Sequence, residues 1–222
     1  PVGQTVGGST TVNSGTCYRV PGRVLQHWRD DLGLDEFTEE ALEPHFDKVE
    51  RILGVAEAKA EYLGGNGRVI ARGCEKLGFK HKPLRRNAPD CDGQGVCVFG
   101  CPTDAKRSTN VSYVPMALRA GAELFHGVRV ERIIVAGGRA TGVVARARDA
   151  EGRTRTVTVH ARAVVISCGS LLTPILLERN GLGLASGELG GNLSIHPAVG
   201  ALAVFDEPIN GWNGIPQGYA IE

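Results

Sequence analysis

The chain has 222 residues, 42% of them hydrophobic, and a formal net charge of +1, all ordinary values for a globular protein. The near-neutral charge gives no support for a nucleic-acid partner, and no apolar run approaches the ~20 residues that a membrane span requires. The absence of a signal peptide from this sequence slightly favours the cytoplasm and leaves the compartment open. Glycine is frequent, with 31 residues, which is typical of a backbone that approaches a ligand closely.

Helical patterns dominate the first part of the chain. Apolar spacing predicts three helices, over residues 23–33, 38–53 and 67–77. Gly33 is expected to end the first helix, and Thr38 is expected to cap the second. Pro44 lies early enough in the second helix to bend it without ending it.

The hydrophobic period changes to two after a short helix predicted at 114–120. Three strands are predicted, over residues 128–135, 140–147 and 154–160, and turn-like segments join them into an antiparallel meander. The continuous apolar run at 163–167 predicts a strand buried in a parallel sheet. Gly169 follows this run, and a helix is predicted over 170–178. The elements together indicate an α/β fold.

Two segments carry chemistry. The strand–glycine–helix unit at 164–177 would direct a helix N-terminus toward an anionic group, although any turn of this kind in an α/β protein looks the same. The opening loop combines Gly7-Gly8, which allows close backbone approach, with the hydroxyl of Ser9 and the amide of Asn13. This loop suits a flavin, and a flexible terminus is the alternative.

Four motifs resemble those of one family, the glucose–methanol–choline oxidoreductases. The sequence GGSTTVNSG at 7–15 resembles the family loop GGS(S/T)xxN(G), and GSLLTPILLERNGLG at 169–183 resembles its second signature, G(A/S)xxTPxLLxxSGxG. The turn GNLSIHP at 191–197 resembles GxNLxDHP, and residues 137–144 resemble the segment that precedes the second signature. Four motifs in the family's order are far more specific than any one of them.

The resemblance implies an incomplete FAD-binding Rossmann-like domain with an antiparallel β-meander, formed by residues 1–16 and 87–197. It also implies a helical substrate-side segment at 17–86 and the start of a substrate-domain sheet at 198–222. The sequence has no GxGxxG on a first strand and no match to the segment that carries the family's active-site histidine. We therefore expect an internal fragment that is inactive alone, with catalytic residues outside it.

The resemblance further implies FAD as the cofactor. The FAD-contacting positions would be Gly7, Gly8, Ser9, Asn13, Gly15, Thr16, Val130, Cys168 and Gly169, with the backbone of Val130 meeting the adenine. The implied activity is oxidation of a long-chain or apolar alcohol to a carbonyl, with hydride transfer to the flavin and reoxidation by oxygen or an electron carrier. One departure from the family pattern is Asn180, where the family usually has serine.

The cysteine-rich segment, residues 91–101, is the sharpest unexplained feature. Cys91, Cys97 and Cys101 could be reduced thiols, ligands of an iron–sulfur cluster, or partners in a disulfide. A cluster would favour an iron–sulfur flavin sugar dehydrogenase, and a structural ion would favour a non-enzymatic metal-binding or interaction module. Lys106-Arg107 reads as a solvated basic pair, with a phosphate clamp as the alternative.

Overall fold

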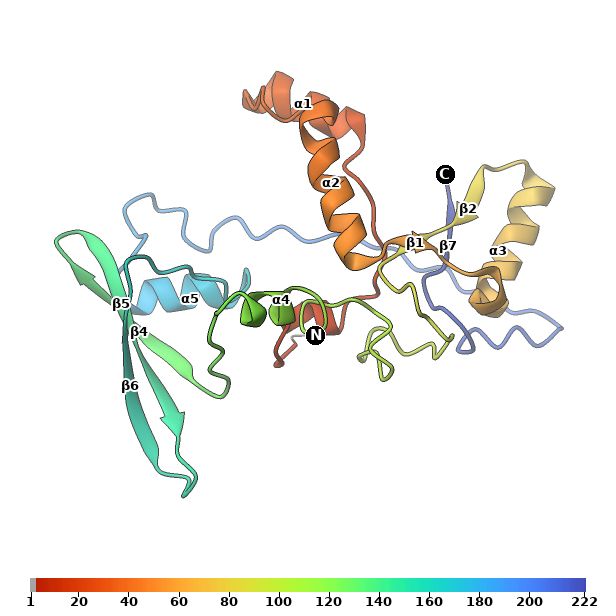
Figure 1. Cartoon of the computed structure of the whole chain (residues 1–222). Coiled ribbons are helices and arrows are strands. Elements are labelled where there is room, and N and C mark those ends of the chain that lie inside the picture. The colour runs from red at the N-terminus through yellow and green to blue at the C-terminus, as the bar shows by residue number, and fades with distance from the viewer. Residues whose placement is uncertain (1–2) are drawn as a thin grey trace. The chain divides into compact units, whose positions relative to one another are not determined.

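The computed structural model describes residues 3–222 and divides into two compact units. Unit 1 contains residues 3–123 together with Val204–Glu222, and unit 2 contains Leu124–Ala203. The fold combines helices with three small antiparallel sheets (Figure 1), which confirms a mixed α/β composition. Among the helices of residues 3–222, none is long and apolar enough to cross a membrane.

The four helices predicted in unit 1 are all present. They are α1 (Gly22–Leu32), α2 (Glu39–Leu53), α3 (Gly64–Leu77) and α4 (Tyr113–Arg119), and two 3-10 turns accompany them, η1 (Gly8–Thr11) and η2 (Ala60–Tyr62). Gly33 ends α1 in the left-handed conformation, with φ of 65°. The Thr38 hydroxyl accepts a hydrogen bond from the Ala41 amide at 3.1 Å, and Pro44 lies inside α2 as expected.

Four short strands in unit 1 were not predicted. They are β1 (Ala56–Glu57), β2 (His81–Pro83), β3 (Arg85–Arg86) and β7 (Tyr219–Ile221), and they pair as β1–β3 and β2–β7. Strands of two or three residues show no readable alternation, so the sequence offers no signal for them. The helix α3 lies against the β2–β7 pair (Figure 1).

The core of unit 1 joins residues that are distant in sequence. Ala58, Leu63 and Ile215 are each less than a tenth exposed and pack together, with Tyr62, Cys91 and Tyr219 around them. Gly65 allows the start of α3 to approach the later segment, because a Cβ there would lie 1.7 Å from the Ile209 carbonyl oxygen. The carboxyl-terminal residues therefore complete the core of unit 1.

A charge cluster connects α2 to two other segments of unit 1. Glu50 pairs with Arg19, which precedes α1, and with Arg85 of β3, each at 2.8 Å. The hydrogen bond from Arg19, supported by that from Arg85, lowers the pKa of Glu50 to about 2. The ionised carboxylate thus cross-links three segments that are far apart in the chain.

Unit 2 holds the predicted meander and one helix. Its elements are β4 (Arg129–Ala136), β5 (Arg139–Arg148), β6 (Thr154–His160) and α5 (Leu172–Arg179), with the strands antiparallel in the order β4–β5–β6. The register of β4 against β5 shifts twice, between Val130 and Arg132 and between Ile134 and Val135. The first shift is a β-bulge that leaves Glu131 without a paired residue on β5.

The strand predicted at 163–167 is wrong for this structure. Residues 163–167 are not in a strand, and Val165 is 87% exposed. A parallel strand requires neighbouring strands for its hydrogen bonds, and within residues 3–222 no strand pairs with this segment. The predicted helix after Gly169 is present as α5, so only the sheet part of this prediction fails.

Candidate cofactor site

The amino-terminal loop, residues 7–16, is a well-connected structure in unit 1. Gly7 and Gly8 have φ of 98° and 54°, conformations that side chains disfavour, and Ser9 follows inside η1. The hydroxyls of Thr10 and Thr109 both donate to the Gly7 carbonyl oxygen, at 2.6 and 3.1 Å. The start of the loop is therefore tied to the segment that precedes α4.

The end of the loop is fixed by Asn13 and Gly15. The Asn13 side chain accepts a hydrogen bond from the Gly15 amide at 3.0 Å, and the Gly15 carbonyl accepts one from the Asn87 amide at 3.0 Å. Gly15 has φ of 88°, and a Cβ there would lie 2.7 Å from the Asn87 side-chain oxygen. The backbone conformation therefore disfavours any side chain at this position, and a Cβ would also force the Asn87 side chain to shift.

Lys106 lies beneath this loop and is only 2% exposed. Its ammonium donates to three backbone carbonyl oxygens, those of Thr11 (2.9 Å), Asn13 and Cys97 (2.7 Å). Burial lowers the pKa of Lys106. The reading of Lys106-Arg107 as a solvated pair is therefore wrong for Lys106, and only Arg107 reaches the surface, where it pairs with Asp90 at 2.7 Å.

A second buried cation, Arg86, supports the loop and is also 2% exposed. Its guanidinium donates to the Ser14 carbonyl at 2.7 Å, the Gln217 carbonyl at 2.6 Å and the Cys97 sulfur at 3.3 Å. Sequence reasoning missed Arg86 because an arginine at the end of a two-residue strand carries no motif. Lys106 and Arg86 together hold the inner side of the amino-terminal loop.

Three buried polar atoms lie at this end of the loop with no hydrogen-bond partner within residues 3–222. They are the Thr16 hydroxyl, the Nε of Arg86 and the side-chain oxygen of Asn87. Unsatisfied buried groups of this kind are rare in native structures, because each costs about 1–3 kcal/mol. Their concentration beside one glycine-rich loop fits a site for a polar ligand.

The three cysteines of the cysteine-rich segment have separate roles. Cys91 packs against the core of unit 1, Cys97 accepts from Arg86, and the Cys101 sulfur accepts from the Lys106 amide at 3.3 Å. All six cysteines are free thiols, and no three His, Cys, Asp or Glu side chains within residues 3–222 are grouped so as to hold a metal ion. The geometry supports reduced thiols and gives no support to the disulfide or the iron–sulfur cluster.

The predicted site residues of unit 2 line a separate hollow. This hollow has a volume of about 430 Å³ and is lined by Val128, Arg129, Val130, Glu131, Cys168, Leu172, Ile175, Leu176 and Arg179. Val130 and Cys168 therefore meet at one cavity, although they are far apart in sequence. Gly169 follows Cys168 with φ of 85°, and its carbonyl oxygen accepts a hydrogen bond from the Thr173 amide at 3.0 Å.

Asn180 fastens α5 to the bulge of β4 in unit 2. Its side-chain oxygen accepts from the Ile133 amide at 2.9 Å, and its amide nitrogen donates to the carbonyls of Glu131 at 3.2 Å and Leu176 at 2.7 Å. The side chain satisfies backbone groups on both elements. Asn180 thus sets the separation of the two walls of the hollow.

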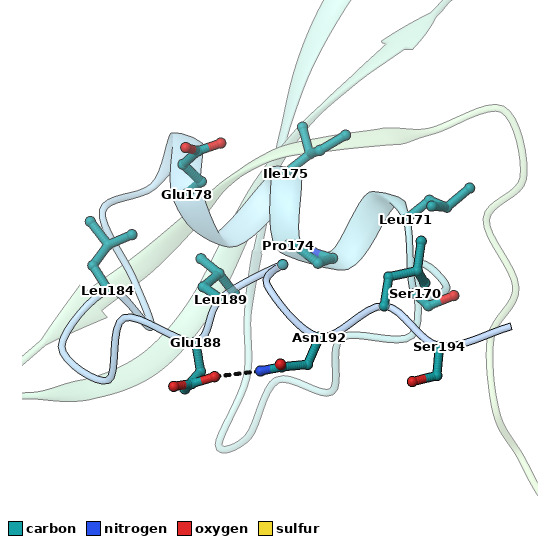
Figure 2. A pocket seen from close by; sticks show the side chains of 12 residues that line it. Ser170, Leu171, Pro174, Ile175, Glu178, Leu184, Glu188, Leu189, Asn192 and Ser194 are labelled. Atoms are coloured by element: carbon teal, nitrogen blue, oxygen red, sulfur yellow. Dashed lines mark hydrogen bonds between the residues drawn. The ribbon is translucent and has the colours of Figure 1, made fainter.

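A second hollow in unit 2, of about 550 Å³, brings two of the sequence motifs together. Figure 2 shows Pro174, Ile175 and Glu178 of α5 on one side and Leu189, Asn192 and Ser194 of the later segment on the other. Asn192 donates to the Glu188 carboxylate, which fixes that segment in its turn. The motifs at 169–183 and 191–197 therefore share one cavity.

The structure groups the predicted site residues into two sets. One set, from Gly7 to Thr16, lies in unit 1, and the other, Val130 with Cys168 and Gly169, lies in unit 2. The meeting of the two sets on a single cofactor stays a prediction. The assignment of residues to an FAD-binding and a substrate-binding domain likewise stays a prediction.

Comparison with known proteins gives a consistent result. A family model described as GMC oxidoreductase matches residues 1–198. An uncharacterized GMC-type oxidoreductase of Mycobacterium tuberculosis is 42% identical over 221 residues, which are 100% of this chain and 34% of the relative. Another, from Sinorhizobium fredii, is 35% identical over 208 residues, 94% of this chain and 40% of the relative.

A third relative has a more informative name. A long-chain-alcohol oxidase of Arabidopsis thaliana is 30% identical over 221 residues, covering 96% of this chain and 29% of the relative. The chain spans about a third of the length of the curated relatives it matches.

Proposed function

Since the chain belongs to the GMC oxidoreductase family, we propose that the protein binds FAD and oxidises an alcohol to a carbonyl compound. FAD would supply the acceptor for the hydride that leaves the alcohol carbon. We assign the residues named above the task of holding the cofactor, and we assign none of them to the transfer of the substrate proton.

The observation that carries the proposal is the construction of the amino-terminal loop. Glycines with positive φ bring its backbone close to any ligand, and buried cations hold its inner carbonyls. The orphaned polar atoms of Thr16, Arg86 and Asn87 add unused hydrogen-bonding capacity beside it. A large polar cofactor such as FAD would satisfy groups of this kind.

The hollow in unit 2 would hold the adenine side of the cofactor. It has one wall from β4, which carries Val130, and one from the turn at Cys168 and from α5. Its lining is largely apolar, with Arg129 and Arg179 among the charged residues, a composition suited to a flat base next to phosphates. The lining of this hollow therefore supports the proposal for the adenine part of FAD.

A long-chain or apolar alcohol is the substrate class that we propose. Support comes from the Arabidopsis relatives that are named long-chain-alcohol oxidases, several of which match at 29–30% identity. Oxygen or an electron carrier would reoxidise the flavin. The lack of a metal-binding group among the cysteines within residues 3–222 favours this activity over an iron–sulfur sugar dehydrogenase.

The proposal is tested with the full-length protein. We expect this protein to carry bound FAD. We expect its flavin to be reduced by 1-dodecanol in preference to glucose or choline, which is followed as the loss of flavin absorbance in the absence of oxygen. Colourless protein that does not bind added FAD contradicts the cofactor assignment. Reduction by glucose but not by 1-dodecanol contradicts the substrate class alone.

Two matched substitutions test the loop itself. Gly15→Ala and Gly33→Ala both place a side chain at positive φ, but only at Gly15 would the new Cβ meet a neighbour, since nothing lies within 4 Å at Gly33. We expect Gly15→Ala to lose most bound FAD and Gly33→Ala to keep it. Equal FAD content in the two variants would show that the loop does not bind the cofactor.

A further inference from the structure

Lys106 is a buried charge whose hydrogen bonds are all made to neutral groups. The carbonyl oxygens of Thr11, Asn13 and Cys97 take up its three donors. Burying an ammonium costs several kcal/mol, and carbonyl dipoles offset this cost only when they all point at it. The stability of the structure around Lys106 therefore depends on all three carbonyls keeping this orientation.

The hydrogen bonds of Lys106 control how the peptide planes of the amino-terminal loop are turned. In a trans peptide the carbonyl of one residue and the N–H of the next point in opposite directions. Because the Asn13 carbonyl points inward to Lys106, the Ser14 N–H is turned to the opposite side. Because the Thr11 carbonyl also points inward, the Val12 N–H faces away and closes η1 on the Ser9 carbonyl.

We propose that Lys106 is a positioning residue for cofactor binding, which rests on the proposed FAD function. Its ammonium fixes the Thr11–Val12 peptide, whose N–H closes η1, and turns the Ser14 N–H away from Lys106, where an anionic or carbonyl-bearing ligand can accept from it. The charge also raises the positive potential behind this donor. Lys106 itself needs no contact with the ligand.

The same proposal gives the cysteine-rich segment a role without metal. The Cys97 carbonyl supplies the third acceptor of Lys106, and the Cys101 sulfur accepts from the Lys106 backbone amide. The segment therefore closes around both the side chain and the backbone of one residue. Small, weakly polar cysteine side chains suit this close packing.

The test replaces Lys106 in the full-length protein. Lys106→Met keeps the length of the side chain and removes all three donors, whereas Lys106→Gln keeps two donors without charge. Lys48→Met, which removes an exposed lysine of α2, is the control. Hydrogen exchange of the apoprotein measures how well the amino-terminal loop is ordered. Quenching of flavin fluorescence gives the dissociation constant of FAD.

We expect exchange over residues 7–16 to accelerate at least about tenfold in Lys106→Met, less in Lys106→Gln, and not at all in Lys48→Met. Exchange in α2 should stay unchanged, and FAD should bind at least about tenfold more weakly to Lys106→Met. If Lys106→Met does not fold, the comparison of Lys106→Gln with the wild type decides.

Two outcomes separate this inference from the function on which it rests. Wild-type exchange over residues 7–16 in both Lys106 variants overturns the positioning role, whatever FAD does. Faster exchange in the loop with unchanged FAD affinity also overturns it, because the loop would then be ordered by Lys106 without serving the cofactor. A wild-type protein that binds no FAD defeats the proposed function, and the exchange result still reports what Lys106 orders.

Discussion

Removing the side chain of Asn180 should destabilise unit 2 where α5 contacts the bulge of β4. Asn180→Ala deletes three hydrogen bonds, to the backbone of Ile133, Glu131 and Leu176. The Ile133 amide belongs to a residue that is 6% exposed, so it would stay buried without a partner. Such a group costs about 1–3 kcal/mol, and the two lost carbonyl contacts add roughly 0.5–1.5 kcal/mol each before hydration recovers part of it.

A net loss of about 2–3 kcal/mol corresponds to roughly 30- to 150-fold faster amide exchange in β4 and β5, since 1.4 kcal/mol is tenfold. Hydrogen exchange with mass spectrometry of the full-length protein resolves this segment. The control is Glu178→Ala, which alters an exposed residue of the same helix and should leave β4 unchanged.

Asn180→Asp tests the same contacts with a side chain of nearly the same shape. The carboxylate can still accept from Ile133, but it cannot donate and it faces the Glu131 and Leu176 carbonyls. Asn180→Asp should therefore destabilise β4 at least as much as Asn180→Ala at neutral pH. Wild-type exchange in β4 for either variant would refute the assignment of Asn180 as the fastening between α5 and the bulge.

Three further outcomes can be checked independently. The ionised Glu50 contributes stability above pH 4.5 that is lost as the pH falls toward 2, so Glu50→Gln should be less stable at neutral pH and flatter across this acid range in circular-dichroism titrations. Leu25→Ala, at a position 1% exposed, should cost about 2–5 kcal/mol in urea unfolding, against less than about 0.5 kcal/mol for the exposed Leu32→Ala. Iodoacetamide should modify Cys101 faster than Cys17 at neutral pH, as measured by mass spectrometry. Burial opposes ionisation of both thiols. Hydrogen-bond donors of the 103–106 turn nevertheless lower the pKa of Cys101, whereas the pKa of Cys17 is raised. Equal rates of modification would contradict this prediction.

Local patterns predicted the local structure well. The Thr38 cap, the Gly33 stop and the turn glycines at 137 and 138 each act over a few residues, so the helices and the meander could be placed from sequence. The family motifs identified the membership that the family model confirms. The strand at 163–167 failed because a parallel strand depends on partners elsewhere, which its own apolar run cannot supply.

The support of the candidate site was the least predictable part. Lys106 looked like a surface residue because its neighbour is Arg107 and charged pairs usually face water. Its burial depends on carbonyls from residues 11, 13 and 97, and carbonyl direction leaves no trace in side-chain sequence. The orphaned atoms of Thr16 and Asn87 are equally invisible before the chain has folded.

The core of unit 1 has a consequence for how this protein is made. Ile215 packs with Leu63, so roughly 150 residues, including all of unit 2, must leave the ribosome before that contact can form. Until then Leu63 and Ala58 lack the apolar contact with Ile215 and can associate with other chains. During synthesis, unit 2 can form its own hairpins while Ala58 and Leu63 are still exposed. We therefore expect chaperones to bind this earlier segment.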